Sequence, residues 1–213
     1  MVSPPPIIGI DFDNTLVCYD VLFHRIAREQ NLIDDTIPVN KTAVRDYLRS
    51  IGREPAWTEM QGVVYGTRII EAEPFPGAID FLTQAGRRGW TLHIVSHKTR
   101  APILGAALDL HAAARRWLET YGVFGPTVAL PRENVWLELT KQEKLRRIET
   151  LGCQVFIDDL PEFLLDPAFP PQTRRFLFDP NRIAAPGVAA AAALETVFSW
   201  SEMLPRVAHV LAH

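Results

Sequence analysis

The sequence predicts an α/β protein built on a parallel sheet, and three observations lead to that prediction. The run Ile7, Ile8 and Ile10 is apolar and β-branched, which is typical of a strand buried on both faces of a parallel sheet. From Pro74 onward, segments with strand and helix character alternate, which indicates parallel strands joined by right-handed crossovers. Several expected strands end in polar residues, and ligands of such sheets bind outside the carboxyl ends of the strands. We therefore expect a Rossmann-like parallel sheet flanked by helices.

Local patterns place the elements after the first strand. A helix is expected to start at Pro76 and Gly77, and Gly86 and Gly89 close it. Thr140 and Glu143 have the spacing of a capping box at the start of a helix that ends near Gly152. The remaining expected strands are 90–95, 127–130, 135–137, 154–157 and 174–178. A helix is expected over 102–121, with one apolar stripe formed by Ile103, Ala107, Leu110, Ala114 and Trp117. One or two further helices are expected within 189–211, and the alanine-rich run 188–194 also has helical character.

An insertion is expected between the first strand and the next strand–helix unit. Three helical patterns cover 20–30, 40–51 and 57–67, and Gly52 and Pro55 break the chain between the last two. The expected organisation is thus an α/β core domain of 1–19 and 74–213, with a small helical insertion of 20–73.

Composition limits the class of protein. The chain has 213 residues, of which 47% are hydrophobic and 22% charged, and this balance is that of a globular protein. A net charge of −3 argues against a general nucleic-acid or anionic-membrane partner, and no apolar run approaches the roughly 18 residues that cross a bilayer. The N-terminus has neither the basic region nor the apolar core of a signal peptide. Two cysteines form no disulfide framework and no metal-binding spacing, so we expect a reduced, cytoplasmic setting.

Acidic and hydroxyl side chains follow several expected strands. Asp11 and Asp13 leave the first strand two residues apart and therefore project to the same side. The hydroxyl of Thr15 follows after two more residues. The other strand ends carry Ser96, the junction of Thr140 and Lys141, and the pair Asp158 and Asp159. Carboxylates that converge on one edge need a hard cation, and oxygen ligands favour Mg²⁺ over zinc.

This group of residues is suited to the chemistry of phosphate esters. A site that combines Mg²⁺, an ammonium group and a hydroxyl can bind the charged oxygens of a phosphoryl group. Asp11 could attack phosphorus and form an aspartyl-phosphate. Asp13 could protonate the leaving oxygen and later deprotonate the attacking water.

These motifs, in this order and spacing, resemble the four motifs of the haloacid dehalogenase (HAD) superfamily over nearly the whole chain. They are Asp11-Phe-Asp-Asn-Thr15, the strand end at Ser96, a lysine before the last acidic strand, and Asp158-Asp159. The second aspartate of the first motif is typical of the phosphatase branch, and the insertion lies where the superfamily has its helical type-1 cap.

The resemblance also implies roles for the site residues. Asp11 would be the nucleophile and Asp13 the general acid and base, while Ser96 would bind the phosphate. Lys141 would neutralise the phosphate and the nucleophile. The Mg²⁺ ligands would be the Asp11 carboxylate, the Asp13 carbonyl and the Asp158 carboxylate. Asp159 would bind the ion through a water molecule or contact the ligands and not the ion itself.

Two assignments leave alternatives open. Either Lys141 or Lys144 could be the motif lysine; Lys141 is favoured because Lys144 lies about 4.5 Å further along the helix axis. His97 and Lys98 follow Ser96 and could contact the substrate or be ordinary loop residues. Five residues of the insertion are weaker candidates for substrate selection, because a surface or core role explains each of them as well: His24, Arg45, Arg53, Trp57 and Arg68.

The function expected from these residues is a Mg²⁺-dependent phosphatase that acts on a small phosphorylated metabolite. A phosphotransferase or phosphomutase for sugar phosphates would use the same motifs. A binding or regulatory module without turnover is a second alternative. The identity of the phosphate ester and the oligomeric state are not determined by the sequence, because specificity depends on the geometry of the insertion.

Overall fold

The computed structural model describes residues 4–184 and 194–212. Contacts within the chain divide it into two compact units. The first comprises Met1–Leu16, Pro74–His97 and Tyr121–His213, and the second comprises Val17–Glu73 and Lys98–Thr120. The second unit thus holds the whole of the expected insertion, together with a segment, Lys98–Thr120, that we had expected in the core domain.

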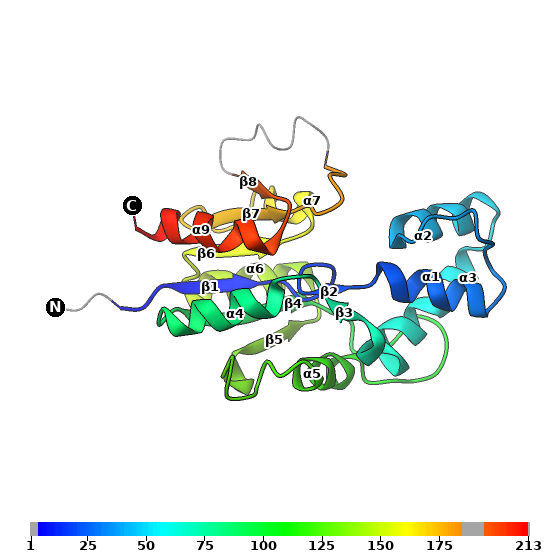
Figure 1. Cartoon of the computed structure of the whole chain (residues 1–213), viewed down its shortest axis with the longest axis horizontal. Helices are drawn as coiled ribbons and strands as arrows, with labels where there is room; N and C mark the ends of the chain where they lie inside the picture. Colours follow the sequence, from blue (N-terminus) through cyan, green and yellow to red (C-terminus); the bar gives the residue numbers. More distant parts are fainter. Residues whose placement is uncertain (1–3, 185–193, 213) are drawn as a thin grey trace. The chain divides into compact units, whose positions relative to one another are not determined.

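A parallel sheet of six strands forms the centre of the first unit (Figure 1). The strand order is β5-β4-β1-β6-β7-β8. The strands are β1 (Ile7–Ile10), β4 (Thr91–His97), β5 (Val135–Glu138), β6 (Val155–Asp158), β7 (Arg174–Phe178) and β8 (Leu194–Val197). Because β1 pairs with both β4 and β6, the segments after these three strands leave the same edge of the sheet. The predicted fold class is confirmed.

Helices in this unit follow the expected alternation. They are α4 (Ala78–Arg87), α6 (Lys141–Leu151), the short α7 (Pro161–Leu164) and α9 (Trp200–Leu211). Helix α6 has the predicted capping box: the Thr140 hydroxyl accepts from the Glu143 backbone N–H, and the Glu143 carboxylate accepts from the Thr140 N–H. Gly152 ends α6 in the left-handed conformation, with φ of 65°. The start and end of α6 therefore follow from the sequence.

Two expectations for the first unit were wrong. Residues 127–130 form a turn and not a strand, because Ala129 has φ of 55° and its N–H donates to the nearby Gly125 carbonyl. The expected closing helix over 189–211 begins only at Trp200. Leu194–Val197 instead forms β8, because parallel pairing with β7 places its ends, Leu194 and Val197, in the core. The rest of the alanine-rich run, 188–193, lies outside the described residues.

The second unit is helical. It contains α1 (Asp20–Glu29), α2 (Lys41–Ser50), α3 (Glu54–Gly62) and α5 (Leu110–Thr120). A π-helical turn, η1 (Val63–Thr67), and a 3-10 turn, η2 (Ile69–Glu71), continue α3. A two-stranded ribbon joins β2 (Val17–Cys18) to β3 (Glu73–Pro74). The three helical patterns that the insertion shows in the sequence are thus present.

The expected helix over 102–121 is shorter than predicted, because α5 begins only at Leu110. The Asp109 carboxylate accepts a hydrogen bond from the Ala112 N–H and so supports the helix start. Before it, Gly105 has φ of 95°, and Ile103, which we had placed on an apolar stripe, is 80% exposed. The apolar stripe in the sequence therefore extends N-terminal to the residue at which the helix begins.

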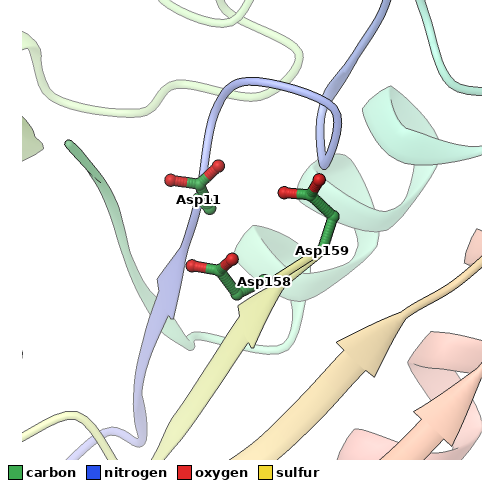
Figure 2. A group of neighbouring side chains, drawn as sticks. All are labelled: Asp11, Asp158 and Asp159. Atoms are coloured by element: carbon green, nitrogen blue, oxygen red, sulfur yellow. The ribbon is translucent and has the colours of Figure 1, made fainter. Parts of the chain in front are cut away.

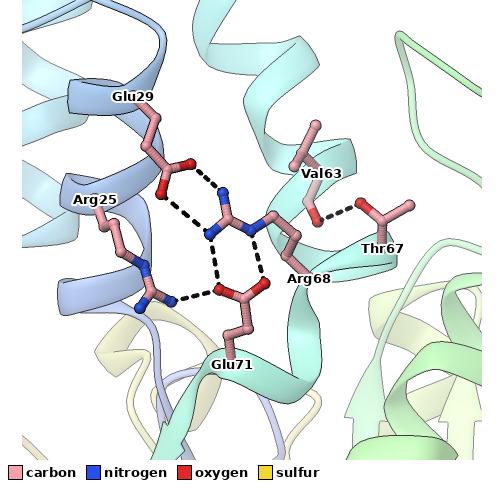
Figure 3. A network of polar contacts seen from close by, with 6 residues as sticks. All are labelled: Arg25, Glu29, Val63, Thr67, Arg68 and Glu71. Atoms are coloured by element: carbon pink, nitrogen blue, oxygen red, sulfur yellow. Dashed lines mark hydrogen bonds and ion pairs between the residues drawn. The ribbon is translucent and has the colours of Figure 1, made fainter.

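Contacts within the second unit account for most of the weaker candidates of the insertion. Arg68 donates to the carboxylates of Glu29 and Glu71, and Arg25 also pairs with Glu71, which links α1 to η2 (Figure 3). The Trp57 ring is buried and stacks on Phe23. His24 bonds the Ile37 carbonyl, and Arg45 pairs with its neighbour Asp46. These side chains have contacts that serve the structure of this unit.

None of the described helices is long and apolar enough to cross a membrane.

Candidate functional site

Three aspartates meet at the carboxyl edge of the sheet. Asp11 follows β1, and its N–H donates to the Ile157 carbonyl of β6 at 2.9 Å. Asp158 is the last residue of β6 and Asp159 is the next, so adjacent strands deliver all three side chains (Figure 2). One carboxylate oxygen from each lies within 4.8 Å of the other two. Asp11 and Asp158 are buried, and Asp159 is partly buried.

A buried lysine lies between two of these carboxylates. The Lys144 Nζ is 2.6 Å from an Asp11 oxygen and 2.6 Å from an Asp158 oxygen. Burial by itself lowers the pKa of Lys144, but the two carboxylates outweigh it and hold this pKa above its usual value. Burial raises the pKa of Asp158 to about 6, and the Lys144 charge opposes that rise. Lys144 is therefore an ammonium group at neutral pH.

The preference for Lys141 over Lys144 as the lysine of the site was wrong, because Lys144 is the one that contacts the aspartates. Lys141 is half exposed, forms an ion pair with Asp166 at 2.6 Å, and lies 3.4 Å from the Glu162 carbonyl. Helical side chains tilt toward the N-terminus of their helix, so Lys144 reaches back from the second turn to the edge of the sheet. Lys144 also lies on the buried face of α6, with Leu145 and Ile148. The prediction compared only the positions of the two lysines along the helix axis. It took no account of this tilt or of which face of the helix is buried.

The loop after β1 is fixed by contacts from distant parts of the first unit. The Thr15 hydroxyl donates to an Asp159 oxygen at 3.3 Å, and the Trp200 indole N–H donates to the Thr15 carbonyl at 3.1 Å. Asn14 adopts φ of 58°, a left-handed conformation that asparagine tolerates and that turns the loop. Asp13 lies in the same loop and is partly buried. The Thr15 hydroxyl thus lies beside the Asp159 carboxylate.

Ser96 and His97 end the neighbouring strand β4. Because Ile10 is in register with Ile94, Ser96 lies about one residue beyond Asp11 along the adjacent strand, and it is buried. His97 is exposed, and its Nε2 is 3.1 Å from the Leu139 carbonyl. Lys98 belongs to the second unit, where its Nζ lies 4.9 Å from the centre of the Tyr65 ring. The site residues gathered within the first unit therefore do not include Lys98.

Two aromatic rings beside Lys144 were not singled out in the sequence. Its Nζ lies 4.2 Å from the centre of the Phe163 ring and 5.4 Å from that of Phe156. In the sequence, both phenylalanines have the character of ordinary core residues. Phe156 precedes Asp158 by two residues and Phe163 follows it by five, and this closeness to Asp158 was the only available signal.

The residues present fit a hard divalent cation. With all groups ionised, three carboxylates and one ammonium group leave a net charge of −2 in a largely buried cluster. Such a charge is costly in a low-dielectric site unless a cation offsets it. The donors are all carboxylate oxygens, which suit Mg²⁺ and similar ions better than softer metals.

Comparison with known proteins gives a match at the level of the fold. No protein-family model and no curated protein matches the sequence. Solved structures do match over nearly the full length of both chains. A haloacid dehalogenase-like protein of unknown function from Agrobacterium tumefaciens has a TM-score of 0.61 at 13% identity, with 99% of this chain and 100% of that chain covered. The chain has the haloacid dehalogenase-like fold.

Other structures with the haloacid dehalogenase-like fold differ in what they are described as binding or doing. A HAD family hydrolase from Deinococcus radiodurans R1, solved with bound phosphate and sodium, has a TM-score of 0.58 at 15% identity and coverage of 98% and 97%. A dehalogenase with an intermediate complex has a TM-score of 0.59 at 14% identity and coverage of 97% and 98%. At these identities the similarity concerns the fold, so the chemistry has to be argued from the site.

Proposed function

We propose that this protein is a HAD-superfamily phosphatase that hydrolyses a small phosphate monoester with Mg²⁺ through an aspartyl-phosphate on Asp11. The observation that carries the proposal is the largely buried cluster of Asp11, Asp158 and Asp159, with the Lys144 ammonium group 2.6 Å from two of its carboxylates. An acidic cluster with a fixed ammonium group is suited to a phosphoryl group that arrives with its metal ion.

The chain's own residues divide the reaction into two steps. An Asp11 carboxylate oxygen attacks phosphorus, the bond to the ester oxygen breaks, and Asp13 gives its proton to that leaving oxygen. Asp13 then takes a proton from water, which attacks the aspartyl-phosphate, releases inorganic phosphate and restores Asp11. Lys144, and not Lys141, offsets negative charge on the nucleophile and the phosphoryl oxygens.

Other residues would bind the metal ion and the phosphate and orient the substrate. Asp158 and Asp159, with Asp11 and the carbonyl of Asp13, would hold the Mg²⁺, which supplies charge stabilisation for the phosphoryl oxygens when it is bound. The buried Ser96 hydroxyl would donate to the phosphate. Thr15 keeps Asp159 in place, and His97, exposed at the edge of the sheet, is a candidate substrate contact. Lys98 is proposed as a further contact because it follows Ser96 by two residues.

The proposal places the enzyme in the cytoplasm, where phosphorylated metabolites occur. Cys18 and Cys153 are both free, which agrees with a reducing compartment. In the proposed organisation the second unit selects the substrate, as a cap.

The decisive experiment is a screen of phosphorylated metabolites with Mg²⁺, followed by kinetics of Asp11→Asn. We expect release of inorganic phosphate that disappears after chelation of divalent ions and in Asp11→Asn, which has no anionic nucleophile. Asp166→Asn, which removes an acid that pairs with Lys141, is the control and should retain activity. Turnover by Asp11→Asn at the wild-type rate would refute the mechanism.

A dehalogenase is the second candidate, because a dehalogenase has the same fold. It would use Asp11 to attack carbon and would need no acid at position 13. Halide release from 2-haloacids, unaffected by Asp13→Ala, would favour that activity over phosphate hydrolysis. Transfer of the phosphoryl group to an added sugar phosphate would instead identify a phosphotransferase.

A further inference from the structure

Lys144 has two kinds of neighbour, and only one of them is charged. Besides the carboxylates of Asp11 and Asp158, the faces of Phe163 and Phe156 lie 4.2 Å and 5.4 Å from its Nζ, measured to the ring centres. The Lys144 and Phe163 side chains are almost completely buried, and Phe156 is completely so. An ammonium group is attracted to the electron-rich face of an aromatic ring, most strongly where water is excluded.

One short segment supplies both rings and one of the carboxylates. Phe156 and Asp158 are two residues apart on β6 and so project to the same face of the sheet. After β6, the Leu160 N–H donates to Asp158, and the Phe163 N–H donates to the Leu160 carbonyl. These contacts fix the Phe163 ring relative to the Asp158 carboxylate.

Among these neighbours, only the Asp11 carboxylate changes in the proposed reaction. When Asp11 accepts a phosphoryl group, its oxygen becomes part of an acyl phosphate and no longer binds the ammonium group as a free carboxylate. The attraction of the phenylalanine rings does not depend on the charge of Asp11. The rings, together with the Asp158 carboxylate, therefore provide the part of the Lys144 environment that stays constant through both steps.

We propose that Phe163, supported by Phe156, is a positioning residue that holds the Lys144 ammonium group at the reacting carboxylate through turnover by a cation–π contact. The inference rests on the proposed phosphatase function for its role in catalysis, whereas the contact itself can be tested without any activity.

Phe169 offers a matched control within the same core cluster. Its ring centre lies 5.6 Å from that of Phe163 and 6.1 Å from that of Phe156, and it is equally buried. The cation against Phe169 is the guanidinium group of Arg175, at 4.7 Å, and not Lys144. Changes at Phe169 thus test packing in the cluster without removing a contact to Lys144.

The experiment replaces Phe163 with 4-fluoro-, 3,5-difluoro- and 3,4,5-trifluorophenylalanine, and makes the same series at Phe169. Fluorine withdraws electron density from the ring face while the ring size changes little. We expect kcat to fall stepwise along the Phe163 series, by about tenfold for the trifluoro ring, and to stay within twofold along the Phe169 series. A flat Phe163 series, or equal losses in both series, would overturn the proposal.

A second readout does not require turnover. Ring currents from Phe163 should shift the NMR signals of the Lys144 side chain, and the shift should be lost in Phe163→Leu and kept in Phe169→Leu. If no phosphatase activity is found, this result still decides whether the ring holds the lysine. Unchanged Lys144 signals in a folded Phe163→Leu protein would overturn the contact, and with it the proposal.

Discussion

At the scale of single residues, the position of Lys144 determines the charge of the site. A lysine with 3% of its surface exposed remains charged because two carboxylates lie at hydrogen-bonding distance. Lys141, one turn earlier on the same helix, instead links the start of α6 to Asp166 after α7. Residue types alone do not distinguish the two lysines, whereas their partners do.

Replacing each lysine by methionine tests this difference. Lys144→Met leaves two buried carboxylates without their shared cation, so we expect it to lower the free energy of unfolding by about 3 kcal/mol and turnover by about 10²-fold or more. Urea unfolding in the absence of Mg²⁺ and phosphate-release assays with Mg²⁺ would measure the two effects.

Lys141→Met is the matched control on the same helix. Its ion pair is partly exposed, so its loss should change stability by less than about 1 kcal/mol and should leave turnover nearly unchanged. If Lys141→Met were the inactive variant and Lys144→Met the active one, the assignment of the motif lysine would revert to Lys141.

At the scale of elements, a sequence motif was a reliable guide where it supplies a hydrogen bond or a conformation that the backbone needs at the end of a helix. The capping box at Thr140 and the left-handed glycine at 152 bound α6 as predicted. An apolar stripe was less reliable: Ile103 fits the stripe of the expected helix, yet it lies before the start of α5 and is exposed. A periodic pattern shows which face a helix would bury and does not show where the helix begins.

The cap of α6 gives a prediction at this scale. Thr140→Ala removes the hydroxyl that accepts from the Glu143 N–H, and we expect it to lower the free energy of unfolding by about 1 kcal/mol. Thr140→Ser keeps a hydroxyl and should retain most of that stability, as measured by urea unfolding. Equal losses in the two variants would show that the methyl group of Thr140, and not its cap, matters.

At the scale of the whole molecule, strand order creates the acidic cluster. Asp11 and Asp158 are 147 positions apart in the sequence, and they meet because β1 and β6 are adjacent and parallel. Pairing of β4 on the other side of β1 brings Ser96 to the same edge. The folded chain thus collects like charges that the unfolded chain keeps apart, and a bound cation would stabilise the folded state selectively.

This linkage predicts that Mg²⁺ stabilises the protein. At a free Mg²⁺ concentration of about 100 times its dissociation constant, the free energy of unfolding should rise by about 2.7 kcal/mol, and chelation should reverse the effect. Thermal and urea unfolding with and without MgCl₂ measure it at constant ionic strength.

The same measurement on Asp158→Asn locates the ion. This variant loses one of the three clustered carboxylates, so its gain from Mg²⁺ should be much smaller, whereas Asp166→Asn should respond as the wild type does. An undiminished gain in Asp158→Asn would mean that the ion binds elsewhere.

The sequence by itself determined the fold class, the ends of α6 and the group of carboxylates, because strand composition, capping residues and acidic strand ends are local properties of the chain. Only the tertiary structure showed that Lys144 is the lysine of the cluster, that Phe163 and Phe156 lie against it, and that 194–197 completes the sheet as β8. These features depend on which face of a helix packs inward and on which strands pair. Both are decided by burial and hydrogen bonding between segments far apart in the chain.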